Sequence, residues 1–237
     1  MQELHIGEND AGQRFDKYLK KLLAEAPGSF VYKMLRKKNI TLNGKKADGT
    51  EKLSCGDEVK LFLSDETYEK FRAKSKTVMP EAFSGSEKTL RQLKVLYEDA
   101  DILIINKPSG MLSQKARPED VSANEYILSY LLREGALTEE EMRTFRPSVC
   151  NRLDRNTSGI LIAGKTLKGL QEMSKALKER TIQKYYRCVV KGEVLREDYL
   201  KGWLVKDERE NKVTVSTVKP KSVDAAPIET AYRPIWT

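Results

Sequence analysis

The sequence is poor in the side chains on which many enzymes depend. It contains one histidine, His5, and three widely spaced cysteines, Cys55, Cys150 and Cys188. A single histidine excludes a Ser-His-Asp triad, a Cys-His pair and a histidine-rich zinc site. The cysteines lack the spacing of metal ligands, so we expect free thiols and no bound metal. Any catalysis must therefore use Asp, Glu, Tyr, Lys or Arg side chains.

Long apolar runs are also missing. Nothing approaches the roughly 18 consecutive apolar residues of a transmembrane helix, and the first residues lack the basic and apolar regions of a signal peptide. We therefore expect a cytoplasmic protein with no membrane partner. The 43 basic residues outnumber the 35 acidic ones and give a net charge of +8. This excess favours an anionic partner, and nucleic acid more than a membrane surface.

Residues 1–64 are predicted to form a small α/β domain. Apolar residues recur at helical spacing over residues 14–23, and a second helix is expected over Ser29–Lys38, with the serine as its cap. The Asn43-Gly44 pair then predicts the turn of a hairpin. Alternating apolar residues predict a half-buried strand over residues 59–63.

A cluster of basic residues lies on the second expected helix and on the turn that follows. Residues 29–46 contain six basic side chains and no acidic one. Such a run is often only a solvated face, but on one helix and one turn it is suited to binding phosphates. The predicted RNA-binding residues are Lys33, Arg36, Lys37, Lys38 and Lys45.

The same region resembles the S4 RNA-binding domain. The first helix carries Arg-x-Asp-x-x-Leu, and residues 38–45 resemble the family's Gly-x-Val-x-Val-Asn-Gly. Asn39 stands where glycine is usual, and asparagine also tolerates the left-handed backbone conformation. The resemblance implies that this unit binds RNA.

A stretch without apolar periodicity follows the first unit. Residues 65–90 are rich in serine, lysine and glutamate and contain Pro80 and Gly85. This composition predicts a linker. We therefore expect a first domain over residues 1–64, a linker over residues 65–90 and a second domain over residues 91–237.

The second domain is predicted to be an α+β fold with a mostly antiparallel mixed sheet. Two strands are expected around residues 95–105, and Ser122 with Glu125 forms a capping box at the start of a helix. A shorter capped helix is expected from Thr138, and an amphipathic helix over residues 167–177. Strands outnumber helices and follow no regular βαβ order, which favours antiparallel pairing.

The most informative segment is Asn151-Arg152-Leu153-Asp154-Arg155-Asn156-Thr157-Ser158-Gly159, directly before the apolar run at residues 160–163. Aspartate and glycine are common in ordinary turns that enter a strand, so composition alone is not specific. A carboxylate between guanidinium groups, however, is kept ionised by them. The arginines also attract phosphate. The segment therefore predicts carboxylate chemistry on a nucleic acid.

The order Arg-Leu-Asp-x-x-Thr-Ser-Gly resembles the catalytic signature of the RluA-type pseudouridine synthases, which convert a uridine in RNA into its C-glycoside isomer. Residues 101–110, ending in Asn-Lys-Pro-Ser-Gly, and residues 184–192 resemble two further motifs of this family. The resemblance implies the family's fold, no cofactor, and Asp154 as the catalytic carboxylate. It also implies that Tyr186 stacks on the target base and that Arg152 helps to displace this base from the RNA helix.

Other residues of these motifs have structural interpretations. Lys107 and Pro108 are expected to shape a turn near the site without reacting, and Lys184 to be a solvated lysine at a sheet edge. Tyr186 and Val190 are expected on one face of a strand. Without the motif, this tyrosine would be as well explained as a core residue.

The chain departs from the family pattern at two places. Asn151 replaces the histidine that usually opens the signature, and an asparagine can still support the loop by hydrogen bonding. The family also carries a late motif with a basic residue that pairs with the catalytic carboxylate. No such motif follows residues 229–237. We therefore expect a second domain that is truncated at its C-terminal end.

The sequence thus predicts an isomerase, an RNA pseudouridine synthase that acts on ribosomal RNA, with transfer RNA as the other substrate class. Asp154 can serve as a nucleophile at C1′ or as a base that removes a sugar proton, and the residues leave both roles open. The alternative function is a catalytically inactive RNA-binding protein that uses the S4 unit. A glycosidase for small sugars is disfavoured because no second carboxylate stands out beside Asp154.

Overall fold

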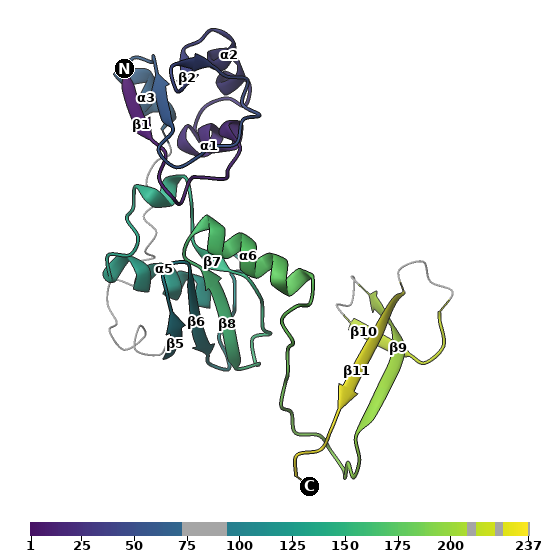
Figure 1. Cartoon of the computed structure of the whole chain (residues 1–237). Helices are drawn as coiled ribbons and strands as arrows, with labels where there is room; N and C mark the ends of the chain where they lie inside the picture. Colours follow the sequence, from purple (N-terminus) through teal and green to yellow (C-terminus); the bar gives the residue numbers. More distant parts are fainter. Residues whose placement is uncertain (73–93, 208–211, 221–224, 237) are drawn as a thin grey trace. The chain divides into compact units, whose positions relative to one another are not determined.

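The chain divides into two compact units, Met1–Gln183 and Lys184–Thr237. The computed structural model describes residues 1–72, 94–207, 212–220 and 225–236. Figure 1 shows the elements in their order along the chain. Most of the predicted linker, from residue 73 to residue 90, lies outside the described residues.

The N-terminal part of the first unit combines short helices with a four-stranded antiparallel sheet of order β1-β4-β2-β3 (Figure 1). The strands are β1 (Gln2–His5), β2 (Ile40–Leu42), β3 (Lys45–Lys46) and β4 (Glu58–Leu61). The helices are α1 (Phe15–Leu22), α2 (Phe30–Arg36) and α3 (Asp65–Phe71). The sequence predicted α1, α2, the β2–β3 hairpin and β4.

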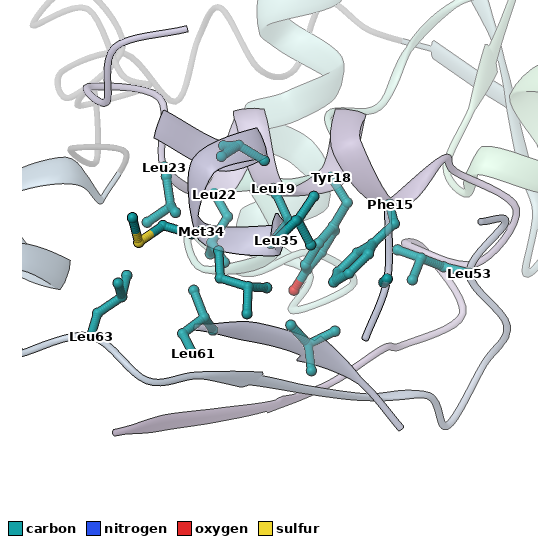
Figure 2. Packing of buried hydrophobic residues seen from close by; sticks show 14 of the residues in the cluster. Phe15, Tyr18, Leu19, Leu22, Leu23, Met34, Leu35, Leu53, Leu61 and Leu63 are labelled. Carbon is teal, nitrogen blue, oxygen red and sulfur yellow. The ribbon is translucent and has the colours of Figure 1, made fainter. Parts of the chain in front are cut away.

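A single apolar cluster holds this part together. Phe15 and Leu19 lie one turn apart on α1 and are fully buried, as are Val59 and Leu61 of β4. Figure 2 shows the side chains of α1 and α2 directed toward the residues of the strands. Each such buried side chain contributes about 1.5–3 kcal/mol relative to an exposed one. The cluster is therefore an independent hydrophobic core.

This core extends past residue 64, where the sequence placed the start of the linker. Ser64 caps α3 by accepting a hydrogen bond from the backbone N–H of Thr67 at 3.2 Å. Tyr68 is buried in the cluster, and the ring centroids of Phe71 and Phe30 are 4.7 Å apart. Residues 65–71 therefore form a helix of the first domain and not part of the linker. Their composition is polar, but Tyr68 and Phe71 lie one turn apart and both pack on the core.

The β2–β3 hairpin has the predicted Asn-Gly turn. Asn43 and Gly44 have φ values of 51° and 70°, which the turn between twisted strands requires. The left-handed residue before β2, however, is Lys38, with φ of 59°. The interpretation of Asn39 as the residue in the glycine position was therefore wrong by one place.

The second part of the first unit contains an antiparallel sheet of order β5-β6-β8-β7 (Figure 1). Its strands are β5 (Lys94–Glu98), β6 (Ile102–Lys107), β7 (Ser148–Val149) and β8 (Gly159–Gly164). The helices are α5 (Ala123–Arg133), a 3-10 turn (Glu141–Arg143) and α6 (Leu167–Lys178). The predicted α+β class and antiparallel pairing are confirmed.

Helix α5 packs against one face of this sheet, and α6 approaches β8. Leu103 and Ile105 of β6 share a fully buried cluster with Ile127 and Leu128 of α5. The capping box at Ser122 is present, as predicted. Gly164 lets α6 come close, because a Cβ there would lie 2.4 Å from the Cα of Leu170.

The second unit contains a three-stranded antiparallel sheet of order β10-β9-β11. Its strands are β9 (Asp198–Asp207), β10 (Lys212–Ser216) and β11 (Ala226–Tyr232). The strand predicted around Tyr186 and Val190 is wrong, because residues 182–190 have no regular secondary structure. A strand needs a hydrogen-bonded neighbour, and within the described residues no other strand pairs with this segment.

Candidate active site

Asp154 lies on the loop that connects β7 to β8, and its side chain is exposed. The backbone turns back at this point, since the N–H of Thr157 donates to the carbonyl oxygen of Asp154 at 3.1 Å. Among the described residues, no hydrogen bond or ion pair engages the carboxylate of Asp154. Both oxygen atoms are therefore free to meet a substrate.

A second loop, which follows β6, fixes the Asp154 loop on both sides of the carboxylate. Before Asp154, the hydroxyl of Ser113 donates to the carbonyl oxygen of Leu153 at 2.7 Å and accepts from the N–H of Leu153 at 2.9 Å. After it, the hydroxyl of Ser109 donates to the carbonyl oxygen of Asn156 at 2.9 Å. The backbone on both sides of Asp154 is thereby held while its side chain stays exposed.

The side chain of Lys107 also supports this loop, through hydrogen bonds to backbone carbonyl oxygens. Its side chain is fully buried at the end of β6. The Nζ atom donates to the carbonyl oxygens of Pro108 at 3.0 Å, Met111 at 2.7 Å and Arg155 at 3.2 Å. Burial lowers the pKa of Lys107, and the negative charge of Asp154 opposes this shift. The buried ammonium group of Lys107 thus binds three backbone carbonyl oxygens, and the negative charge of Asp154 favours its protonated form.

Asn151 supports the other end of the loop, as the sequence predicted. Its side chain donates to the carbonyl oxygen of Ile160 at 3.2 Å and accepts from the N–H of Ile162 at 2.9 Å. The backbone of Gly159 has φ of 134°, a conformation that L side chains rarely adopt. The entry into β8 therefore depends on an amide side chain and on a glycine.

Arg152 and Asp154 share this loop, but their side chains do not pair. Arg152 and Arg155 are both exposed, and among the described residues neither guanidinium group forms an ion pair with the carboxylate. These arginines therefore form no ion pair with the carboxylate in the described residues, and their expected effect on its ionisation stays a prediction. The sequence assigned Lys107 only to a turn, whereas in the structure the charge of Asp154 acts on the pKa of this buried lysine.

Tyr186 belongs to the unit Lys184–Thr237, whereas Asp154 and Arg152 belong to the unit Met1–Gln183. Its side chain is 64% exposed, so the alternative interpretation as a core tyrosine does not hold. The predicted stacking of this ring on a target base stays a prediction.

The basic residues predicted to bind RNA lie together on the N-terminal part. Helix α2 buries Val31, Met34 and Leu35, and its opposite side is charged. The residues exposed there and in the following hairpin are Lys33, Arg36, Lys37, Lys38 and Lys45. The helix thus presents its cations to solvent because its apolar residues are used in the core.

Among the described residues, no group of three or more His, Cys, Asp or Glu side chains could hold a metal ion. Within the same residues, no helix is long and apolar enough to cross a membrane. All three cysteines carry free thiols.

Known proteins resemble this chain over most of its length. The sequence profile of RNA pseudouridylate synthase matches residues 101–235. Ribosomal large subunit pseudouridine synthase C from Vibrio vulnificus is 32% identical over 198 residues, which cover 81% of this chain and 56% of that protein. The protein of the same name from Pasteurella multocida is 31% identical over 217 residues, which cover 87% of this chain and 60% of that protein. The chain thus spans somewhat more than half the length of these relatives.

Among solved structures, human RNA pseudouridylate synthase domain containing 4 is similar to this chain with a TM-score of 0.41 and 15% identity. The similarity covers 62% of this chain and 54% of the human chain. The profile match includes the Asp154 loop and the loop that holds it, and it extends over more than half of the sequence. The chain therefore belongs to the RNA pseudouridylate synthase family.

Proposed function

We propose that this protein isomerises specific uridines of RNA to pseudouridine, with Asp154 as the catalytic carboxylate. The observation that carries the proposal is the arrangement of the loop. Asp154 is exposed on a segment whose neighbours, Leu153 and Asn156, are fixed by hydroxyl groups of a second loop. Catalysis requires such a preorganised group with free oxygen atoms.

The reaction makes limited chemical demands. The bond between N1 and C1′ breaks, the base turns, and C5 bonds to C1′ as it loses its hydrogen. No electrons are exchanged with a partner, so the reaction needs no cofactor. A free carboxylate can attack C1′ or remove a sugar proton, and Asp154 is suited to either role.

The base must leave the RNA stack before it can react, at a cost of a few kcal/mol. Aromatic and guanidinium contacts with the displaced base or its strand offset that cost. We assign these contacts to Tyr186 and Arg152, both of which are exposed. The ring would stack on the base, and the guanidinium group would occupy the space that the base leaves.

The substrate that we propose is ribosomal RNA. The relatives from Vibrio vulnificus and Pasteurella multocida are ribosomal large subunit synthases by name, and this chain carries a net charge of +8. The exposed cations of α2 and its hairpin would bind backbone phosphates. A cytoplasmic location is the corresponding proposal, because ribosomal RNA is made and folded there in bacteria.

Tritium release from RNA that contains 5-tritiated uridine tests the proposal directly, because C5 must lose its hydrogen. We expect the wild-type protein to release tritium from bulk ribosomal RNA, and Asp154→Asn to release none while its RNA affinity changes by only a few-fold. Glu134→Gln, which changes an exposed carboxylate at the end of α5, is the matched control and should retain activity. Turnover by Asp154→Asn would refute the assignment.

The second candidate function is RNA binding without catalysis. It is favoured by the separate apolar core of the N-terminal part, which needs no catalytic residue. It predicts no tritium release from any RNA, together with an affinity that falls steeply with salt. Neutralising the four cations of α2 and its end should then flatten that salt dependence by about 0.7–0.9 for each phosphate that is no longer neutralised. The four are Lys33, Arg36, Lys37 and Lys38.

A further inference from the structure

A buried carboxylate organises the surface where α1 meets α2. The side chain of Asp16 is only 7% exposed. Its oxygen atoms accept hydrogen bonds from Nε of Arg14 at 3.1 Å and from the hydroxyl of Tyr32 at 2.9 Å. The Nζ of Lys20 lies 3.8 Å from the same carboxylate and donates to the Tyr32 hydroxyl at 2.9 Å. One acidic group thus fixes three outer side chains.

The charge of Asp16 is maintained although the group is buried. Burial raises the pKa of Asp16. The hydrogen bonds from Tyr32 and Arg14 and the charges of Arg14 and Lys20 together lower it by more, so that the net shift is downward. A buried ion is costly to desolvate, and hydrophobic residues often stabilise a core as well as an ion pair does. The network around Asp16 keeps the carboxylate ionised and holds the side chains of Arg14, Lys20 and Tyr32 in place.

The side chains that Asp16 fixes form a surface suited to a nucleotide. The Tyr32 side chain remains 39% exposed, and the Nζ of Lys20 lies 4.7 Å from its ring centroid. Arg36 follows Tyr32 by one turn on α2 and therefore lies on the same side of the helix. An exposed ring among cations is the combination that stacks a base and binds the adjoining phosphate.

We propose that Tyr32, Arg14 and Lys20 form a binding site for one unpaired nucleotide of RNA, and that Asp16 is the residue that positions them. The base stacks on the Tyr32 ring, and the phosphate contacts the two cations. Paired bases of an RNA helix do not present their faces, so the site selects single-stranded or loop RNA. The inference rests on the proposed RNA substrate and adds the class of RNA that the N-terminal part binds.

Fluorescence anisotropy with two labelled RNAs, an unstructured oligouridine and a perfect duplex, tests the site. We expect Tyr32→Ala to weaken binding of the oligouridine about tenfold, within the range of base-aromatic stacking, and to leave duplex binding nearly unchanged. Phe62→Ala is the matched control, because Phe62 is an exposed aromatic residue of the same part of the chain. This control should bind both RNAs like the wild type.

Asp16→Asn separates positioning from simple charge. The substitution raises the net charge by one, so electrostatic attraction alone would tighten RNA binding. Loss of positioning weakens it, and we expect a severalfold weaker affinity for oligouridine when binding is measured well below the unfolding midpoint of the variant. This midpoint should be lower than that of the wild type, because Asp16 is buried and its pKa is lowered in the folded state. Tyr32→Phe keeps the ring but loses the hydroxyl that bonds to Asp16. It should lie between the wild type and Tyr32→Ala.

The outcomes distinguish this site from the synthase activity. Equal oligouridine affinity of Tyr32→Ala and wild type overturns the site, even if tritium release proves the synthase. Tighter binding by Asp16→Asn overturns the positioning role. Absence of tritium release, with binding that depends on Tyr32, supports the site and overturns the synthase. A wild-type protein that binds neither RNA overturns the site, and tritium release then decides the catalytic proposal independently.

Discussion

Replacing Lys107 by methionine tests whether the buried ammonium group positions the loop of Asp154, the carboxylate that we propose to be catalytic. Methionine keeps most of the length of the side chain but cannot donate a hydrogen bond. The carbonyl oxygens of Pro108, Met111 and Arg155 lose this donor. The oxygen of Arg155 keeps a second donor, the N–H of Gly110 at 2.8 Å. All three carbonyl groups lose their charged partner, and those of Pro108 and Met111 are left without another donor among the described residues.

The expected loss of stability is the difference between two larger effects. Each hydrogen bond to a charged group contributes about 1.5–3 kcal/mol. The loss of the two bonds whose acceptors have no second donor, those to Pro108 and Met111, therefore costs about 3–6 kcal/mol. Removing the charge also relieves the desolvation of a buried ammonium group, which amounts to several kcal/mol and which the lowered pKa of Lys107 reflects. We expect a net destabilisation of about 2 kcal/mol. In a protein of this size, that lowers Tm by roughly 4–8 °C.

The expected effect on catalysis is larger than the effect on stability. A displacement of about 1 Å in a reactive group can reduce turnover by about 100-fold. We therefore expect kcat for tritium release to fall about 10- to 100-fold, with KM for RNA changed by only a few-fold. Lys94→Met is the matched control, because Lys94 is exposed on the neighbouring strand β5. It should retain both the wild-type Tm and the wild-type kcat.

The Tm and kcat values of the two variants together show whether Lys107 positions the loop or only stabilises the fold. If Lys107→Met loses stability but turns over as fast as Lys94→Met well below its Tm, the ammonium group stabilises the sheet and does not position the loop. If neither Tm nor kcat changes, water replaces the three hydrogen bonds and their removal costs the fold nothing.

Two further predictions concern the sheet that carries this site. Gly164→Ala places a Cβ against the backbone of Leu170, and should destabilise the protein by about 1–3 kcal/mol, whereas Gly7→Ala, which has open space around it, should leave the urea midpoint unchanged. For Glu98, burial raises the pKa, but the hydrogen bonds from Lys165 and Tyr130 and the charge of Lys165 together lower it more, and the net shift is downward. Ionised Glu98 therefore stabilises the fold above its unfolded-state pKa, and this contribution is lost as the pH falls through the folded-state pKa. Between pH 6 and pH 3, Tm should consequently fall less in Glu98→Gln than in the wild type, and parallel curves would contradict this.

Local patterns predicted the elements around the site because local forces form them. The capping box at Ser122 and the Asn43-Gly44 turn are satisfied by residues within a few positions of one another. The apolar run at residues 160–163 forms β8, in which Leu161, Ile162 and Ala163 are buried and the first and third of these share a cluster with residues of α5. Where a helix or a turn is specified by neighbours in the sequence, the sequence suffices to predict it.

The contacts that build the site could not be predicted in this way. Ser113 bonds to Leu153, which is 40 residues away, and a single serine in a loop carries no pattern that identifies its partner. The motif at residues 106–110 indicated that Lys107 lies near the site, but not that its side chain is buried and bonds to the backbone of the Asp154 loop at Arg155. The segment around Tyr186 was predicted to be a strand, but it has no regular secondary structure. Alternation of apolar residues predicted the strand, but it did not specify a neighbouring strand for pairing.

The polar groups around Asp154 hold its loop through the main chain and leave its carboxylate oxygen atoms free within the described residues. A carboxylate that accepts several hydrogen bonds is stabilised as an anion and becomes a weaker nucleophile and a weaker base. Here the donors of Ser109, Ser113 and Lys107 are all directed to backbone carbonyl oxygens. Within the described residues, the oxygen atoms of Asp154 are left free. The loop is therefore held through its main chain, and the side chain of Asp154 keeps the free oxygen atoms that its proposed catalytic role requires.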